Sequence, residues 1–150
     1  MGRRVLVTGA SGFIGSTLVA GLQDHGDVPV AMVRETSKLD NLEGRGREVE
    51  LAYATLSDVD AMAQAMRDVE VVYHVAGLTA AFRPEAFQRA NAEGVANVLE
   101  AARKAGVARV VYMSSLMAAG YSHPEVPHRE HHVASPGTHY GISKLAGERI

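Results

Sequence analysis

The sequence predicts an α/β fold, in which a doubly wound, mostly parallel sheet carries helices on both faces. Short Val-rich runs of strand length alternate with segments of helical period, as in successive βαβ units. A glycine-rich turn follows the first of these runs directly. Of the 150 residues, 47% are hydrophobic and 21% charged, which suits one domain with a packed core.

Five strands are expected from the apolar runs. Continuous Val-rich runs are typical of strands that are buried on both faces of a parallel sheet. The expected strands are residues 5–7, 28–33, 49–52, 71–75 and 110–113.

Three helices are expected between these strands. Apolar residues recur at helical spacing from Ile14 to Leu22 and again over residues 59–66. A longer helix is predicted to begin at Pro84, a favoured first-turn residue, and to end near Gly106. The segments 44–46 and 122–137 have the composition of loops.

The end of the chain predicts a further helix. Residues 140–150 resemble its opening turns, without a stop signal, so we interpret the chain as a fragment of a longer protein.

Composition excludes several classes of function. A net charge of −2 gives no broad basic field for nucleic acid. The chain has no cysteine, and no apolar stretch approaches the roughly 20 residues that span a bilayer. The N-terminal apolar run is broken at once by Thr8 and Gly9, so it is not a signal peptide. We therefore expect a soluble, cytoplasmic protein with neither membrane nor nucleic-acid partners.

The turn after the first strand has the properties of a phosphate-binding turn. Glycines permit a tight bend and let backbone N–H groups approach a pyrophosphate, and the following helix N-terminus favours an anion. Its spacing differs from the commoner G-x-G-x-x-G, so alone it is a weak signal. The predicted cofactor contacts here are Thr8, Gly9, Ser11, Gly12, Phe13, Ile14 and Gly15.

The chain resembles the extended short-chain dehydrogenases/reductases of the NAD-dependent epimerase/dehydratase superfamily. The turn at residues 8–15, His74-Val75-Ala76-Gly77 after the fourth strand, Asn91, Ser114-Ser115 and Tyr140-Gly141-Ile142-Ser143-Lys144 occur in the family's order. The resemblance covers all 150 residues. It implies a Rossmann-type NAD(P)-binding domain over residues 1–150 that lacks the family's C-terminal strands and substrate subdomain. It also implies that Ala76, Gly77, Asn91 and Ser114 border the cofactor.

The residue after the second strand favours NADP(H). An NAD enzyme would place Asp or Glu near the adenosine ribose, roughly 20 residues beyond the turn. This chain has Arg34 there, and Arg34, helped by Lys38, can pair with a 2′-phosphate. A solvated surface arginine is the alternative, and NAD(H) stays open. The segment also resembles the flavonoid-reductase and hopanoid-associated branches of the family.

By resemblance, Leu56 is the predicted contact with the adenine, but the residue before it departs from the family pattern. Thr55 stands before Leu56 where relatives usually carry Asp, although a Thr hydroxyl can still form a hydrogen bond.

Tyr140 and Lys144 are the predicted proton-transfer pair. Four residues apart, they share one face of a helix, so both can point at one ligand. Tyr140 would donate a proton to a carbonyl oxygen as hydride arrives, and Lys144 would stabilise the phenolate. By resemblance, Lys144 also binds the nicotinamide ribose and Ser115 holds the oxygen. The substrate would be a ketone or a secondary alcohol.

Five histidines crowd the end of the chain but match no familiar metal site, so none is expected. They are His123, His128, His131, His132 and His139.

A nucleotide-sugar epimerase and a non-catalytic dinucleotide-binding module stay open as alternative functions. A nucleotide-sugar epimerase would use the same residues with tightly held NAD, although Ala119 replaces its frequent Tyr. Against a sugar 4,6-dehydratase, Leu116 and Met117 occupy the place of an acidic pair. A non-catalytic dinucleotide-binding module is disfavoured because Tyr140 and Lys144 are both retained. A small-molecule substrate and a homo-oligomer are expected.

Overall fold

The computed structural model describes residues 2–43, 48–123 and 125–150. The loop predicted at residues 44–46 lies outside these ranges. The chain divides into two compact units, one from residues 1–76 and 97–113 and the other from residues 77–96 and 114–150.

The first unit contains a parallel sheet with the strand order β3-β2-β1-β4-β5. The order reverses between β1 and β4, which is the switch point where doubly wound sheets bind their ligands. The predicted strands are confirmed, with bounds that differ by one residue at most ends. They are β1 (Arg4–Thr8), β2 (Val28–Val33), β3 (Glu50–Tyr53), β4 (Val71–His74) and β5 (Arg109–Tyr112).

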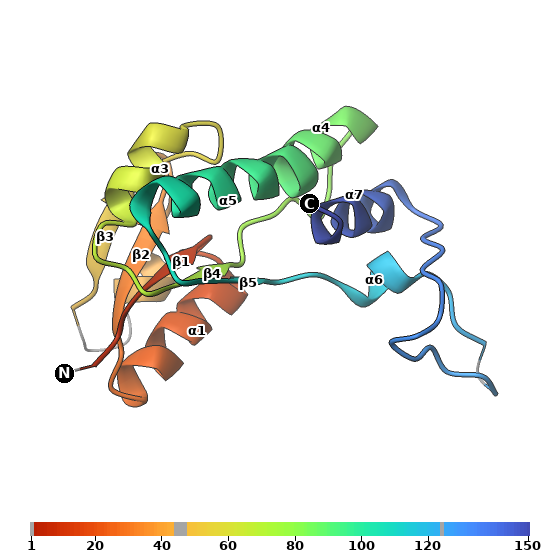
Figure 1. Cartoon of the computed structure of the whole chain (residues 1–150), viewed down its shortest axis with the longest axis horizontal. Helices are drawn as coiled ribbons and strands as arrows, with labels where there is room; N and C mark the ends of the chain where they lie inside the picture. The colour runs from red at the N-terminus through yellow and green to blue at the C-terminus, as the bar shows by residue number, and fades with distance from the viewer. Residues whose placement is uncertain (1, 44–47, 124) are drawn as a thin grey trace. The chain divides into compact units, whose positions relative to one another are not determined.

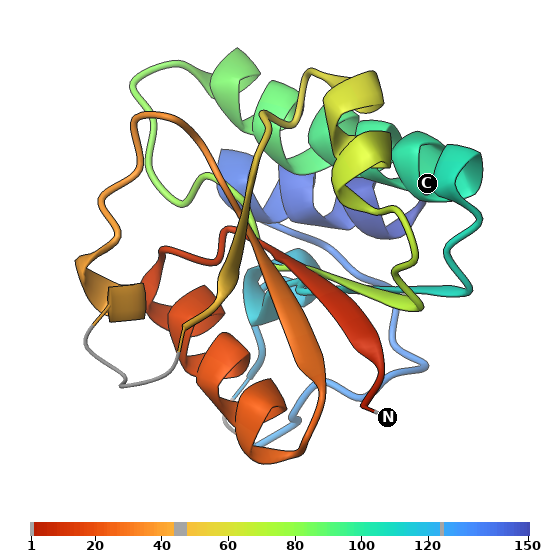
Figure 2. The same cartoon turned by 90° about the vertical axis from the view of Figure 1, so that its left-hand side faces the viewer.

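Helices cover both faces of this sheet, as expected (Figure 1). Side chains of a strand alternate between the two faces of the sheet. In β1, Leu6 lies on one face, and Val5 and Val7 lie on the other face. Leu6 packs with helices α3 (Val59–Ala65) and α5 (Gly94–Ala105), the latter from residue 97 onward. Figure 2 shows β1 and β2 side by side. The opposite core contains residues of α1 (Phe13–Asp24) and α2 (Asp40–Glu43).

Burial on both faces holds for the central strands but not for the outer ones. β1 and β2 are buried over most of their length, whereas β3 and β5 contain no buried residue. Each outer strand has a neighbour on one side only within the described sheet. In the first helix, Val19 and Leu22 are buried as expected from the helical period, but Ile14 is 52% exposed.

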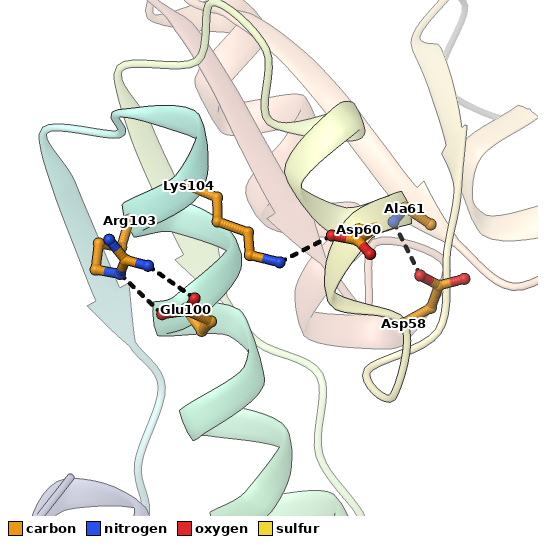
Figure 3. A network of polar contacts seen from close by, with 6 residues as sticks. All are labelled: Asp58, Asp60, Ala61, Glu100, Arg103 and Lys104. Atoms are coloured by element: carbon orange, nitrogen blue, oxygen red, sulfur yellow. Dashed lines mark hydrogen bonds and ion pairs between the residues drawn. The ribbon is translucent and has the colours of Figure 1, made fainter.

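An exposed polar network joins α3 to α5 on one face of the first unit (Figure 3). Lys104 Nζ donates to Asp60 at 2.9 Å, and Arg103 forms two bonds of 2.9 Å to Glu100. The Asp58 side chain accepts from the N–H of Ala61 and so caps α3. Exposed ion pairs of this kind contribute little to stability because water screens them, so apolar burial dominates this packing.

The long helix predicted from Pro84 to Gly106 is interrupted. It consists of α4 (Pro84–Gln88), the π-helical turn η1 (Arg89–Glu93) and α5, which ends at Ala105. The sequence did not predict the interruption, because Arg89–Glu93 contain no glycine or proline that would mark a break in a helix.

The second unit contains α4, η1 and two later helices that the sequence indicated only in part. They are α6 (Leu116–Ala119) and α7 (His139–Glu148), and α7 packs on α4, η1 and α6. The helix expected over residues 140–150 is confirmed as α7, while α6 and α2 were not predicted. Among the described residues, no helix has the length and apolarity to cross a membrane.

Candidate functional site

The glycine turn connects β1 to α1 in the first unit. Gly9 has φ +67°, and a Cβ there would lie 2.8 Å from the backbone of Ala76, two residues beyond the end of β4. A Cβ at Gly15 would lie 2.1 Å from the carbonyl oxygen of Gly9. Both positions therefore need glycine for the turn to close against α1 and β4.

The tip of this turn is open to solvent and suits an anion. Gly12, Phe13 and Ile14 are exposed, and Gly12 caps α1 without a side-chain hydrogen bond. No acidic residue lies in the first turn of the helix. The N–H groups in the first turn of α1 and the positive end of the helix dipole are thus available to a pyrophosphate, so these residues fit a dinucleotide.

Thr8 holds the ends of β1 and β4 together. Its fully buried hydroxyl accepts from the N–H of Ala76 at 3.1 Å and lies 2.7 Å from Nδ1 of His74. The buried side chain thus serves this strand junction, and a cofactor contact by Thr8 stays a prediction.

Arg34 and Lys38 lie on the segment that follows β2. Both side chains are exposed. Among the described residues, neither side chain forms an ion pair, so the Arg34 guanidinium and the Lys38 ammonium face solvent. Leu56, the predicted adenine contact, is partly buried against the α3 and α5 core, and its carbonyl accepts from Asn97 at 2.8 Å.

Tyr140 and Lys144 lie on α7 in the second unit, one helical turn apart. The Tyr140 ring packs edge-on against Phe87 of α4, with the ring centroids 6.2 Å apart. Lys144 is only 3% exposed, and this burial lowers its pKa to about 8, with Glu148 acting in the opposite direction. An ammonium with a lowered pKa can gain or lose a proton near neutral pH.

Ser115 is brought close to this helix through α6. Its side chain caps α6 by accepting from the N–H of Met117 at 3.2 Å. A Cβ at Gly141 would lie 2.2 Å from the carbonyl oxygen of Met117, so α6 and α7 touch where Gly141 has no side chain. The three predicted catalytic residues thus come from two helices in close contact.

Asn91 lies in the π-helical turn and fastens two segments of the second unit. Its Oδ1 accepts from the N–H of Leu78 at 2.7 Å, and its Nδ2 donates to the Leu78 carbonyl at 2.9 Å and to Ser143 Oγ at 3.0 Å. Ser143 in turn donates to the carbonyl of Tyr140 at 2.7 Å. Gly77 leaves room here, because a Cβ would lie 3.1 Å from Oδ1 of Asn91. These bonds hold the Gly77 loop and the first turn of α7.

Ser114, predicted to border the cofactor, has a protein partner in this structure. Its hydroxyl donates to the carboxylate of Glu148 on α7, one turn beyond Lys144. The segment that carries Ser114 and Ser115 is thereby tied to α7 within the second unit.

The histidine-rich loop belongs to the second unit. The rings of His131 and His132 pack edge-on with their centroids 4.5 Å apart, and His128 Nε2 lies 3.0 Å from the carbonyl oxygen of Tyr121. Among the described residues, no group of three or more His, Cys, Asp or Glu side chains is placed to hold a metal ion.

Several residues around these sites were missed by the sequence analysis. Glu148 and Asn41 stand in no motif, and no role was predicted for Gly141 and Ser143 within the Tyr140–Lys144 motif. The helical positions of Ser143 and Glu148, on the same helix as Lys144, were the available signal.

Comparisons with known proteins identify relatives of this chain. A model of the NAD dependent epimerase/dehydratase family matches residues 5–150. Sterol demethylase protein B of Methylococcus capsulatus is 37% identical over 149 residues, covering 95% of this chain and 44% of that protein. Ceramide reductase of Caulobacter vibrioides is 37% identical over 144 residues, covering 96% and 40%.

A solved structure is also similar. UDP-glucose 4-epimerase from Brucella ovis, in complex with NAD, has 26% identity and a TM-score of 0.86, covering 98% of this chain and 46% of that one. The chain thus spans less than half the length of these three proteins.

Proposed function

The chain belongs to the NAD dependent epimerase/dehydratase family. We propose that it is part of an NADP(H)-preferring oxidoreductase of the short-chain dehydrogenase/reductase type. Its reaction is the transfer of hydride between the nicotinamide and a ketone or secondary alcohol. The family itself includes epimerases, dehydratases and dehydrogenases, so the cofactor preference and the reaction are the proposal.

One observation carries the preference for NADP(H). Arg34 follows β2 directly, where an NAD enzyme would carry an acid, and its exposed side chain has no ion-pair partner among the described residues. A guanidinium can form two charge-assisted hydrogen bonds with a phosphate. Lys38, four residues on and also exposed, can add a second positive charge.

The proposed chemistry assigns one task to each catalytic residue. The nicotinamide supplies or accepts the hydride when it is bound. Tyr140 donates its phenolic proton to the carbonyl oxygen of a ketone, or takes that proton back from an alcohol. Ser115 donates a hydrogen bond to the same oxygen, and the charged form of Lys144 stabilises the phenolate that Tyr140 leaves behind.

Calorimetric titration of both reduced cofactors tests the preference. We expect NADPH to bind at least about tenfold more tightly than NADH, and Arg34→Ala to remove most of that difference. Arg109→Ala, which removes an exposed arginine at the start of β5, is the matched control and should leave the ratio unchanged. Equal affinities, or an NADH preference that survives Arg34→Ala, would overturn the assignment and favour an NAD-dependent epimerase.

A further inference from the structure

The segment between Arg34 and Glu43 is folded locally, although it contains only a single short helix. The N–H of Ser37 donates to the carbonyl of Arg34 at 2.9 Å, and the N–H of Arg34 donates to Ser37 Oγ at 3.0 Å. These two bonds close a turn that starts at Arg34. The backbone that carries the guanidinium therefore has a defined local conformation, although these two bonds do not set its position relative to the glycine turn.

Two leucines anchor the second half of this segment in the core beneath the sheet. Leu42 is 5% exposed, and Leu39 packs against the same apolar cluster, which also contains Val33 at the end of β2. The N–H of Leu42 donates to the carbonyl of Leu39 at 2.7 Å, so the two residues begin a helical turn. Lys38, just before Leu39, is held at the surface by this anchor.

Asn41 connects this segment to the glycine turn. Its Nδ2 donates to the carbonyl oxygen of Ser11 at 3.0 Å, across 30 positions of sequence. Ser11 lies directly before Gly12, the residue that caps α1. A single side-chain bond thus joins the turn that would bind the pyrophosphate to the segment with Arg34 and Lys38.

We infer that Asn41 is a specificity-determining residue, which positions the Arg34–Lys38 segment relative to the glycine turn. A dinucleotide can then bind with its pyrophosphate at the turn and its 2′-phosphate at Arg34 and Lys38. The inference rests on the proposed preference for NADP(H). In a dinucleotide the adenosine ribose fixes the separation of its 2′-phosphate from the pyrophosphate. Two anion sites held at a constant separation need no reordering on binding, and this preorganisation favours the doubly anchored cofactor.

A charged neighbour also makes the position of Arg34 matter. Glu35, the next residue, is exposed and negatively charged, and Asp40 lies on the first turn of α2. A segment free to move could present these carboxylates to the 2′-phosphate, and like charges in close contact oppose binding. Asn41 acts against that movement, so its loss should weaken NADPH binding more than NADH binding.

Calorimetric titration of the 150-residue chain with NADPH and NADH tests the inference without any need for turnover. For Asn41→Ala we expect the affinity ratio to fall from about tenfold or more to about threefold or less. In an Arg34→Ala background, Asn41→Ala should leave the ratio unchanged, because the group that it positions is already absent.

Gln23→Ala is the matched control. Gln23 Nε2 also donates to a distant backbone carbonyl, that of Glu48, at 3.1 Å and across 25 positions. Its loss should leave the cofactor ratio unchanged. A wild-type preference for NADPH that persists undiminished in Asn41→Ala, or that falls equally in Gln23→Ala, overturns the inference alone. A wild-type chain that binds both cofactors equally, or neither, overturns the proposed function and the inference with it.

Discussion

Burial changes the acid–base chemistry of Lys144. Burial lowers its pKa from an ordinary value of 10.5 to about 8. Between these two values the unfolded chain binds more protons at this site than the folded chain does, so folding stability rises with pH. Below pH 8 the ammonium is charged in both states, and its burial destabilises the fold.

Replacement of this lysine should therefore stabilise the protein while removing its chemistry. We expect Lys144→Met to be more stable than the wild type at pH 7 by on the order of 2 kcal/mol, and this advantage to shrink as the pH rises from about 8 to 10.5. Denaturant unfolding at several pH values measures it. Lys104→Met is the control, because Asp60 raises the pKa of Lys104 and no such gain is expected. Equal stability of Lys144→Met and the wild type throughout this range would contradict the burial argument.

Tyr140 offers a prediction about the proton alone. In a form of the protein that turns over a ketone, Tyr140→Phe should lose most of its kcat while cofactor affinity stays within a few-fold, because only the transferable proton is removed. Lys144→Ala should reduce both turnover and cofactor affinity. Steady-state kinetics and cofactor titration separate these effects. Unchanged turnover in Tyr140→Phe would identify another acid, with the adjacent His139 as the first residue to replace.

At the scale of elements, the contact between α6 and α7 depends on a missing side chain. A Cβ at Gly141 would lie 2.2 Å from the Met117 carbonyl oxygen and 3.0 Å from Cβ of Pro136. We expect Gly141→Ala to separate the two helices, to destabilise the protein by about 1 to 3 kcal/mol and to lower turnover by displacing Ser115. Thermal unfolding and kinetics measure the two effects.

A second helical glycine provides the matched comparison. Gly21 lies within α1, and a Cβ there would meet nothing within 4 Å. Gly21→Ala should therefore stabilise the chain by about 0.5 to 1 kcal/mol through helix propensity. If Gly141→Ala stabilised the chain as much as Gly21→Ala, the close approach of α6 and α7 would not be required.

At the scale of the whole molecule, β5 provides the expected route to self-association. It pairs with β4 on one side only within the described sheet, and Val111 and Met113 are 42% and 41% exposed. Unpaired backbone groups at such an edge can pair with another chain. We expect the 150-residue chain to form dimers or larger species, and Val111→Lys to weaken them. Sedimentation velocity over a range of concentrations is the measurement, and a monomer throughout would contradict the expectation.

The sequence by itself determined the layout of the fold. Strands alternate with helices because their hydrophobic periods differ, and a period is a local property that can be read from one sequence. The glycine turn was also predictable, since the bend and the approach of Gly9 to Ala76 both exclude a Cβ. The spacing of Tyr140 and Lys144 placed both on one helix for the same local reason.

Only the tertiary structure decided which distant residues form the hydrogen bonds that stabilise these sites. Nothing local marks Asn41 as the partner of Ser11, or Ser143 as the partner of Asn91, because each pair is separated by 30 or more residues. The π-turn at η1 was equally hidden, since its residues, Arg89–Glu93, include no glycine or proline that would mark it. The burial that lowers the pKa of Lys144 likewise comes from chain packing rather than from spacing along α7. Hydrogen-bond partners and burial are set by which segments meet in space, and a single sequence states only which residues are available to meet.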